Sequence, residues 1–444
     1  MRESSLQYRY LKSQMVVVFI CFLFIFLQFN ITISGSSTES IIYVDDDNIS
    51  GPWDGTQDYP YQYIQDGIDA ANDGDTVFVF NGIYNGQIIV DKSIMLEGEN
   101  KNTTIIDGQI NSDIIRIISN GTVIHDLTIT NRVSGIYADQ VGISIVSKNN
   151  LIYDNILIDN ECGLYVQVLN SNITIINNVF NNNTAAIKLR FTSDTLIMNN
   201  TLDNNYACIS MTFADHITIY GNTILTRGGI SVIDSYNCNI TKNYVSTNGT
   251  NIRLESSEAN MISKNYFKGY IGVFFTEISN NNWICNNTFT NHKWGLKLFW
   301  GSSNNIINGN MIVNSTEHGV FFNSGSCNGN IFSNNTIMNS STCGIYFNSA
   351  CADNQFYHNN FIDNYVHANV RGSNLWDDGR YGNYWDDYEE QYPDARKTLR
   401  SIWNTPYELN EENIDCFPLV NEYSGSMSNS IYGFFIQLIK TLMI

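Results

Sequence analysis

Aromatic side chains recur at regular intervals between residues 274 and 346, and a lysine stands among them. Phe274, Lys297, Phe321 and Tyr346 follow one another at 23 to 25 residues. Sugar rings have apolar C–H faces and hydroxyl groups, so aromatic rings with a few polar groups suit them. The sequence therefore predicts a glycan-binding surface; the alternative is an outer sheet whose aromatic residues only stack on one another. The predicted surface consists of Phe274, Trp294, Lys297, Phe299, Trp300, Phe321 and Tyr346.

Carboxylates do not recur with these aromatic residues, which limits the catalytic chemistry of this surface. A two-acid glycosidase needs a pair of Asp or Glu side chains beside the scissile bond. Two series of residues share the spacing, and neither brings two carboxylates into succession. A polysaccharide lyase or hydrolase is the alternative function, with its site elsewhere or near Arg116, Asp126 and Asp139; the sequence identifies no catalytic residue. The two series are Tyr165, Lys188, Ser210, Ser231, Arg253, Phe274, Lys297, Phe321, Tyr346 and Gln167, Arg190, Thr212, Ile233, Glu255, Thr276, Phe299, Asn323, Asn348.

Histidines and cysteines give no metal-ligand pattern. The six histidines fall at different places relative to the repeat, and no Cys, His or Met cluster has the spacing of a metal site, so no metal residue is predicted. Cys327 and Cys351 lie 24 residues apart, in consecutive repeats of nearly matching register. They are a candidate disulfide, and the alternative is a pair of small buried thiols.

A repeat of 21 to 25 residues must position all of these side chains. Ten asparagines follow one another at that spacing, which is typical of a solenoid. Each has an apolar residue three positions before it and another two positions after it. The ten asparagines are Asn155, Asn178, Asn200, Asn222, Asn243, Asn265, Asn287, Asn310, Asn335 and Asn360.

Within each repeat, apolar and polar residues alternate with period two, as in the stretch Ile187-Lys188-Leu189-Arg190. No helical periodicity runs long enough for a helix, so each repeat is predicted to be one coil of short parallel strands. Stacked coils would place the asparagines in a ladder at one corner. Glycines at a further corner are expected to permit a sharp bend; these are Gly163, Gly229, Gly272, Gly295, Gly319 and Gly344. A β-sandwich with Asn-rich loops is the alternative fold.

The repeated units N-x-[FIL] and G-[IVL]-x-[FL], with the motif GNYWDDY at 382–388, resemble those of the NosD-type parallel β-helix repeat proteins and their pectin-lyase-like relatives. The resemblance covers about residues 41 to 421. It implies an all-β, single-stranded right-handed parallel β-helix with an N-terminal helical cap. Copper or calcium is possible by this resemblance alone. The stretch where relatives place an Asp-Gly-rich calcium loop reads EEQYPDARKTLRSIWN here and lacks the alternating ligands.

The chain divides by composition into five predicted segments. Residues 1–36 combine a basic start, an apolar run and small residues, which is typical of a signal peptide or a membrane anchor. Residues 41–103 hold the N-terminal cap, with an amphipathic helix expected from Ile64 to Ala71, and the first coils. Residues 104–365 hold the repeats, and 366–421 the C-terminal cap. The tail 422–444 has an apolar segment too short for a span.

The formal net charge is −20, from 23 Lys and Arg against 43 Asp and Glu. This excludes the basic patch that nucleic acids and anionic membrane surfaces require. The leader predicts an extracytoplasmic protein, secreted or at the cell surface, with membrane attachment possible through either terminal segment. We expect a structural or adhesive protein whose partner is a polysaccharide or envelope glycan. A NosD-like copper-handling accessory protein is the third hypothesis.

Overall fold

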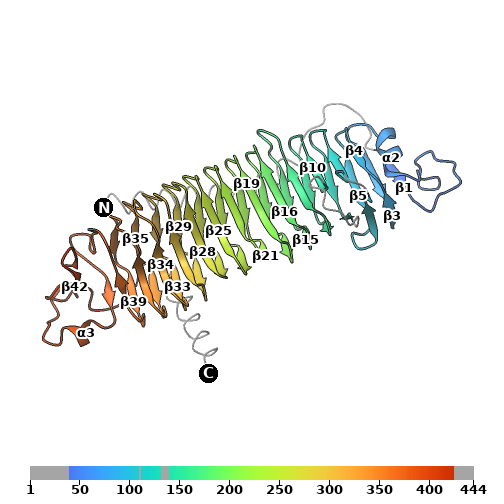
Figure 1. The fold of residues 1–444 in the computed structure, drawn as a ribbon. Helices are drawn as coiled ribbons and strands as arrows, with labels where there is room; N and C mark the ends of the chain where they lie inside the picture. The colour runs from blue at the N-terminus through green and yellow to red at the C-terminus, as the bar shows by residue number, and fades with distance from the viewer. Residues whose placement is uncertain (1–39, 110–111, 132–139, 425–444) are drawn as a thin grey trace, which may run out of the picture. The chain divides into compact units, whose positions relative to one another are not determined.

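The structure is a computed structural model that describes residues 40–109, 112–131 and 140–424. Their strands form three long parallel sheets, A, B and C, and successive strands of the chain enter the sheets in turn (Figure 1). One coil of the regular region consists, for example, of β11 in sheet A, β12 in sheet B and β13 in sheet C. The predicted parallel β-helix is confirmed, and the β-sandwich alternative is wrong, because strands pair with the next coil rather than with a neighbour in sequence.

The bounds of the strands follow sheet by sheet. Sheet A consists of β1 (Ile41–Val44), β2 (Thr76–Val79), β5 (Met95–Gly98), β8 (Val123–His125), β11 (Leu151–Tyr153), β14 (Thr174–Ile176), β17 (Leu196–Met198), β20 (Thr218–Tyr220), β23 (Asn239–Thr241), β26 (Met261–Ser263), β29 (Trp283–Cys285), β32 (Ile306–Asn308), β35 (Ile331–Ser333) and β38 (Gln355–Tyr357). Sheet B consists of β3 (Gly82–Asn85), β6 (Thr104–Asp107), β9 (Thr128–Thr130), β12 (Ile156–Ile158), β15 (Val179–Asn181), β18 (Thr201–Asp203), β21 (Thr223–Thr226), β24 (Tyr244–Thr247), β27 (Tyr266–Lys268), β30 (Thr288–Thr290), β33 (Met311–Val313), β36 (Thr336–Met338), β39 (Asn360–Ile362) and β41 (Tyr384–Trp385). Sheet C consists of β4 (Ile88–Val90), β7 (Ile115–Ile117), β10 (Val141–Ile145), β13 (Cys162–Val166), β16 (Ala185–Arg190), β19 (Ala207–Thr212), β22 (Ile230–Ile233), β25 (Thr250–Glu255), β28 (Ile271–Thr276), β31 (Trp294–Leu298), β34 (His318–Phe322), β37 (Cys343–Phe347) and β40 (Ala368–Asn369).

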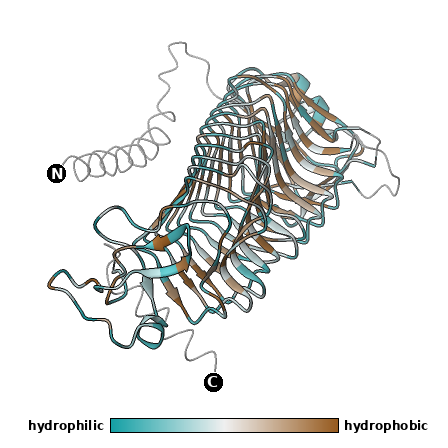
Figure 2. Ribbon diagram, turned by 60° about the vertical axis from the view of Figure 1, so that its left-hand side comes forward, coloured by the Kyte–Doolittle hydropathy of each residue, from teal (hydrophilic) through white to brown (hydrophobic). Residues whose placement is uncertain are grey.

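The core is a set of apolar columns inside the coils. Ile152, Ile175 and Ile197 pair in register in sheet A, and each is fully buried. Leu157 and Phe180 do the same in sheet B. Hydrophobic residues recur along the strands of consecutive coils (Figure 2). Burying one such side chain contributes about 1.5 to 3 kcal/mol, so the apolar columns hold the stack together.

The predicted asparagine ladder lies at the corner between sheets A and B. Asn200 donates its backbone N–H to Asn222 Oδ1 at 2.9 Å and its side-chain Nδ2 to the same oxygen at 3.0 Å. Asn222 Nδ2 in turn donates to Ile197 O at 3.0 Å. Each amide is therefore satisfied by the coils on both sides of it, which a buried polar group requires. The ladder runs in this way from Asn155 to Asn335.

The last asparagine predicted for the ladder, Asn360, is wrong; the ladder residue is its neighbour Asn359. Asn335 donates its N–H to Asn359 Oδ1 at 3.0 Å, whereas Asn360 begins β39 and bonds Thr336 and Tyr423. The inward apolar residue three positions before the ladder is accordingly Phe356, which is fully buried. Two adjacent asparagines offered two registers, and the burial of Phe356 decides between them.

The ladder then continues beyond the regular repeats. Asn359 bonds Asn383, and Asn383 donates its N–H to Asp415 Oδ2 at 2.8 Å. The Trp385 Nε1–H donates to the same oxygen at 2.9 Å, and the Phe417 N–H donates to Oδ1 at 3.0 Å. A buried carboxylate thus ends the asparagine column.

Two further ladders were missed by the sequence analysis. One lies at the corner between sheets C and A and is linked by the same amide bonds; the other is short and lies between sheets B and C. The signal was present as N-x-[IF]-x-x-N, since the C–A asparagines of the repeats stand five residues before those of the A–B ladder. The C–A ladder comprises Asn260, Asn282, Asn305, Asn330, Asn354, Asn374 and Asn413, and the B–C ladder Asn160, Asn183 and Asn205.

The repeated glycines lie at the start of the sheet C strands, and their role differs from the predicted bend. None of the six has a positive φ. A Cβ at Gly272 would stand 2.2 Å from Gly295 O and 2.4 Å from a ring carbon of Phe289. A Cβ at Gly319 would stand 2.7 Å from Gly344 O. Glycine is needed because the next coil and the core side chains approach too closely for any other residue.

The amphipathic helix expected near the N-terminus is present as α2 (Ile64–Ala70). Ile64, Ile68 and Ala71 are buried as the pattern predicts, and α2 contacts β1, β2 and β4. Lys92 Nζ donates to the carbonyl oxygens of Ile68, Asp69 and Ala71 at 2.6 to 3.0 Å. A cation at this end gives the last carbonyls of the helix a further partner and lies favourably at the negative end of the helix dipole.

Stacked aromatic rings fill the residues that follow the last repeat. The short helix α3 (Tyr388–Gln391) and the antiparallel hairpin of β42 (Tyr407–Asn410) and β43 (Asn413–Asp415) belong to this part. Trp385 stacks on Phe361 of β39 at 4.4 Å and on Tyr407 at 4.2 Å, as measured between ring centroids. These rings extend the core past the regular coils. The predicted leader at 1–36 and most of the tail at 422–444 lie outside the described residues.

Candidate functional site

The predicted glycan-binding residues lie together on the outer side of sheet C. Phe274 of β28 pairs with Lys297 of β31, which pairs with Phe321 of β34, which pairs with Tyr346 of β37. Trp294 lies on β31 as well, and Phe299 and Trp300 directly follow that strand. We call the seven residues the aromatic surface. The predicted register of Phe274, Lys297, Phe321 and Tyr346 is confirmed, whereas the role of the seven residues in binding stays a prediction.

Ring contacts join the aromatic surface into two groups, one of Phe274, Phe299 and Trp300 and one of Trp294, Phe321 and Tyr346. Centroid distances are 6.3 Å between Phe274 and Phe299 and 4.7 Å between Phe299 and Trp300, whose rings are stacked. Trp294 lies 5.2 Å from Phe321 and Phe321 lies 5.9 Å from Tyr346. Aromatic pairs at these distances attract one another. The rings therefore form two groups on four consecutive coils, and the Lys297 ammonium lies near rings of both groups.

Lys297 is the cation of this surface. Its Nζ lies 4.7 Å from the ring centroid of Phe274, 4.5 Å from that of Trp294 and 5.9 Å from those of Phe299 and Phe321. Ring faces attract cations at such distances. Burial lowers the pKa of Lys297, and the positive charge of Lys293 lowers it further. Among the described residues, the Lys297 ammonium has no carboxylate or hydrogen-bond partner.

The aromatic residues differ in exposure. Trp300 is 54% exposed, whereas Phe321 is only 8% exposed. Trp294, Phe274 and Tyr346 are half-buried. Phe321 thus forms the floor of the surface and Trp300 its accessible rim, so a ligand would touch Trp300 rather than Phe321.

The structure adds three neighbours that the sequence analysis did not place at this surface. His318 pairs in register with Trp294 and stacks on Tyr346 at 4.5 Å. Lys293 lies 4.3 Å from the Trp294 ring and forms an ion pair with Glu317 at 3.1 Å. Tyr270 contacts Trp294 edge to face. Trp294 and His318 stand three positions before Lys297 and Phe321, so the same register would have placed His318 beside Trp294.

Two buried nitrogens of this region have no hydrogen-bond partner among the described residues. They are Trp294 Nε1 and His318 Nδ1. A buried polar atom without a partner costs about 1 to 3 kcal/mol, so each of the two nitrogens would gain from a hydrogen-bond acceptor or donor. Burial lowers the pKa of His318 although Glu317 acts in the opposite direction.

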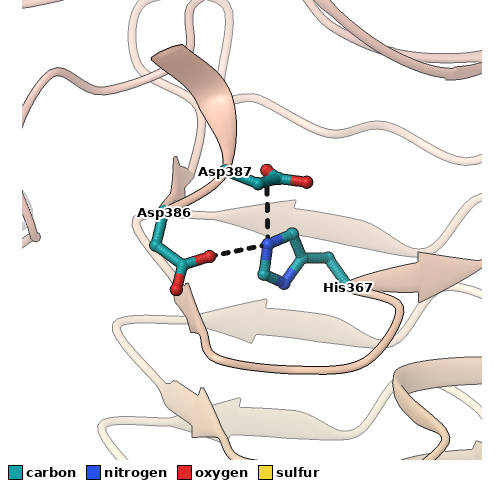
Figure 3. Close-up of side chains that lie close together, drawn as sticks. All are labelled: His367, Asp386 and Asp387. Atoms are coloured by element: carbon teal, nitrogen blue, oxygen red, sulfur yellow. Dashed lines mark ion pairs between the residues drawn. The ribbon is translucent and has the colours of Figure 1, made fainter. Parts of the chain in front are cut away.

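A second cluster lies past the last repeat, where His367 faces Asp386 and Asp387 (Figure 3). His367 Nε2 lies 2.8 Å from Asp386 Oδ1 and 3.2 Å from Asp387 Oδ1. Burial favours the neutral imidazole, but hydrogen bonds to both carboxylates and their charges outweigh burial and raise the pKa of His367 to about 9. We call these three residues the His-Asp triad. Asp386 and Asp387 belong to the motif GNYWDDY, and the sequence analysis missed their approach to His367.

The His-Asp triad is the one group in the described part of the chain whose His, Cys, Asp or Glu ligand atoms could share a metal ion, since they lie within 4.8 Å of one another. One imidazole nitrogen and two carboxylate oxygens fit the ligand preferences of Cu(II) and Zn(II). They do not fit Cu(I), which prefers sulfur. The outer oxygens of both carboxylates are held by the Asp363 N–H at 2.6 Å and the Gln391 side chain at 2.7 Å. An ion would have to displace the imidazole proton.

The alternative catalytic residues are not brought together. Arg116 lies on β7 of sheet C and contacts Asp113 at 3.5 Å. Asp126 follows β8 of sheet A and contacts His125 Nδ1 at 2.8 Å. Asp139 lies outside the described residues. Arg116 and Asp126 therefore belong to different sheets and do not form one constellation.

Cys327 and Cys351 lie against each other in consecutive coils. Both are buried free thiols, and the neighbouring Cys351 thiol raises the pKa of Cys327. The Cys351 thiol also approaches Ser324 O at 3.3 Å. The predicted adjacency is therefore present, and the disulfide itself stays a prediction.

Solved structures of other proteins share the fold of this chain. The A-module of mannuronan C-5 epimerase AlgE6 from Azotobacter vinelandii has a TM-score of 0.51 at 17% identity, over 76% of this chain and 98% of that one. The A-module of mannuronan C-5 epimerase AlgE4 from the same organism has a TM-score of 0.50 at 17% identity, over 75% of this chain and 99% of that one. At this identity the likeness shows the shared fold.

No curated protein sequence matches the chain. No described helix has both the length and the apolar character to cross a membrane. The sequence profile of the family described as periplasmic copper-binding protein (NosD) matches residues 68–229, 170–297 and 226–390, which together cover most of the chain. With its parallel coils and asparagine ladders, this chain belongs to the NosD family.

Proposed function

We propose that the protein is an exported β-helix that binds a glycan through the aromatic surface. The observation that supports this is that rings of both aromatic groups lie within 5.9 Å of Lys297 Nζ on the outer side of sheet C. Rings on an exposed sheet present flat apolar faces to sugar rings, and Lys297 and His318 supply polar groups beside them. The unpartnered Trp294 Nε1 and His318 Nδ1 add hydrogen-bonding capacity that a sugar hydroxyl could use after a small rearrangement.

The fold of the structural relatives supports the proposal in a general way. Two proteins on this fold are named as mannuronan C-5 epimerases, and mannuronan is a polysaccharide. A solenoid suits a long polymer because consecutive coils offer an extended binding surface. The basic start and apolar run of residues 1–36 support export, as does the periplasmic family description.

A glycan array with the mature protein tests the proposal. We expect binding to polysaccharide probes that falls at least tenfold in Trp300→Ala and Trp294→Ala, because removing a Trp that carries binding energy costs about 2 kcal/mol or more. Phe321→Ala is a poor probe of contact, since that ring is buried.

Phe213→Ala is the matched control. Phe213 is 48% exposed, stacks on Phe191 at 5.1 Å and lies beyond the aromatic surface, at the end of β19. The Phe213→Ala variant should bind the glycans of the array as tightly as the unchanged protein does. Equal binding by Trp300→Ala, Trp294→Ala and the unchanged protein would contradict the proposal.

Metal handling is a second candidate function, favoured by the His-Asp triad. When a Cu(II) or Zn(II) ion is bound, His367 Nε2, Asp386 and Asp387 would hold it and the ion would supply positive charge at this end of the solenoid. His367 must lose its proton first. Because its pKa is raised to about 9, affinity should rise between pH 6 and pH 9.

Calorimetric titration with Cu(II) and with Zn(II) tests this candidate. His367→Ala should abolish a stoichiometric binding event. His216→Ala is the control, because His216 also contacts an aspartate at 2.8 Å but is exposed on a regular coil. Binding that survives His367→Ala, or that is lost equally in His216→Ala, would reject the triad as the site.

A further inference from the structure

The geometry points to an anionic sugar as the ligand of the aromatic surface, with a carboxylate or a sulfate ester pairing with Lys297 Nζ. This inference rests on the proposed glycan-binding function and adds the chemical class of the ligand. The shared chemistry is a fixed negative charge on a sugar ring.

Lys297 is a cation without an anion. Its ammonium is half-buried among the rings of Phe274, Trp294, Phe299 and Phe321, and no described carboxylate contacts it. Two neighbouring cations are already paired. Lys293 contacts Glu317 at 3.1 Å, and Arg253 contacts Glu255. Ring faces replace only part of the hydration that a buried ammonium loses, so an anion beside Lys297 would be strongly favoured.

The charge distribution over the three sheets supports an anionic ligand. The strands of sheet C hold five basic residues and one acidic residue, Glu255. The strands of sheets A and B hold one lysine, Lys268, and three acidic residues. An otherwise acidic protein thus concentrates its strand cations on the sheet that carries the aromatic surface. The five are Arg116, Lys188, Arg190, Arg253 and Lys297.

The arrangement of rings and charge suits one sugar unit with its substituent. Phe299 lies between Lys297 and the exposed Trp300, at 5.9 Å from the Lys297 Nζ and 4.7 Å from the Trp300 ring. A sugar that stacks on the exposed face of the Trp300 ring lies close enough to Lys297 for a charged substituent to reach its ammonium. A neutral sugar would leave the ammonium without a counter-charge.

The test compares probes that differ in charge alone. The carboxylate arm uses a mannuronate hexamer and the methyl ester of the same hexamer. The sulfate arm uses a sulfated galactan hexamer and its desulfated form. Affinities for the full mature chain are measured by calorimetry at 50 and 300 mM NaCl. We expect at least one charged probe to bind about tenfold more tightly than its neutral partner, with a preference that shrinks at the higher salt.

Lys297→Met keeps the aliphatic stem and removes the charge, so it should abolish that preference while binding the neutral probe as before. Lys297→Arg should keep the preference. Lys188→Met is the matched control, since Lys188 occupies the same outward column of sheet C without a ring around its ammonium, and it should retain the preference. Circular dichroism and the unfolding temperature of each variant verify that it is folded.

The outcomes separate the two ideas. If the unchanged protein binds charged and neutral probes equally, or if Lys297→Met keeps the preference, the anionic class is wrong and glycan binding stands. If no probe binds the unchanged protein, and the glycan array is also blank, the proposed function falls and the inference falls with it. The arm that shows the preference identifies the substituent as carboxylate or sulfate.

Discussion

The asparagine ladders and the aromatic surface are built on the same coils but follow opposite rules. In the ladders the same side chain returns at each coil, is fully buried and bonds its own copy above and below. On the outer side of sheet C the side chain changes at each coil, from Ser210 and Ser231 to Phe274 and Lys297, while the backbone register stays constant. The buried side chains repeat from coil to coil and specify the fold, whereas the outward side chains of sheet C differ from coil to coil.

This difference has a physical cause. A buried amide must satisfy every donor and acceptor, and a stack of identical coils offers the same partners each time, so Asn returns. An outward side chain has water as its alternative partner and is free to vary. A local cluster of rings on such a face is therefore not required by the repeat, whereas the columns inside the coils are.

The largest effect should come from breaking a ladder in its middle. In Asn222→Ala, the Asn200 N–H and Nδ2 lose their acceptor and Ile197 O loses a donor. Unsatisfied buried groups of this kind cost about 1 to 3 kcal/mol each, so we expect the free energy of unfolding to fall by about 3 kcal/mol or more. Urea unfolding followed by circular dichroism measures it.

Asn248→Ala is the control for that experiment, because Asn248 is exposed and outside the ladders. It should change the free energy of unfolding by less than about 0.5 kcal/mol. Equal losses in the two variants would mean that the ladder is no more important than any surface amide. Glycan binding should persist in Asn222→Ala wherever the protein remains folded.

The end of the ladder should give a pH-dependent effect of intermediate size. Burial raises the pKa of Asp415 to about 7, although the N–H groups of Asn383 and Trp385 oppose the shift. In the unfolded chain an aspartate loses its proton near pH 4. Between about pH 4 and pH 7 the folded chain keeps a proton that the unfolded chain has lost, so stability falls as the pH rises through this window.

The unfolding temperature measured from pH 4.5 to pH 7.5 checks this. The unchanged protein should lose several degrees across the range, and Asp415→Asn should flatten that part of the profile because it cannot ionise. A profile that keeps its full slope in Asp415→Asn would assign the pH dependence to other groups. The variant should also lose the bond from the Phe417 N–H, which lowers stability at every pH.

The difference between repeated buried side chains and variable outward ones also explains which features of the structure the sequence could predict. The fold, the strand register of sheet C and the A–B ladder from Asn155 to Asn335 follow from the period alone. The choice of Asn359 over Asn360 could not be made from spacing, because both asparagines fit. The His-Asp triad was missed although the period extends to Asn383, 24 residues after Asn359, because the approach of His367 to both aspartates depends on side-chain directions that the period does not determine.

The aromatic surface shows a different limit. Spacing predicted which residues share a face, since pairing in a parallel stack fixes their positions. It did not predict that Phe321 lies beneath the others or that Lys297 lies among four rings. Those facts depend on side-chain rotamers, which the period does not determine.

Trp294→Ala should lower the free energy of unfolding less than Asn222→Ala does, and it should weaken glycan binding. The ring is half-buried and contacts Lys293, Lys297 and Phe321, so its removal should cost about 1 kcal/mol of folding free energy. Binding to the best glycan probe should fall at least tenfold. Measured together, the two quantities separate a binding role from a packing role, because a purely structural ring would lose stability and leave the affinity of the folded fraction unchanged.

The smallest effect should come from an earlier position in the column that holds Lys297. Ser231 points outward from β22 and is linked through Arg253 to Phe274 by the same register. Its hydroxyl forms no described hydrogen bond, so Ser231→Ala should change stability by less than about 0.5 kcal/mol and leave glycan affinity within twofold. Loss of binding in Ser231→Ala would show that the ligand contacts coils well before β28, and the binding surface would then have to extend along sheet C toward Ser210.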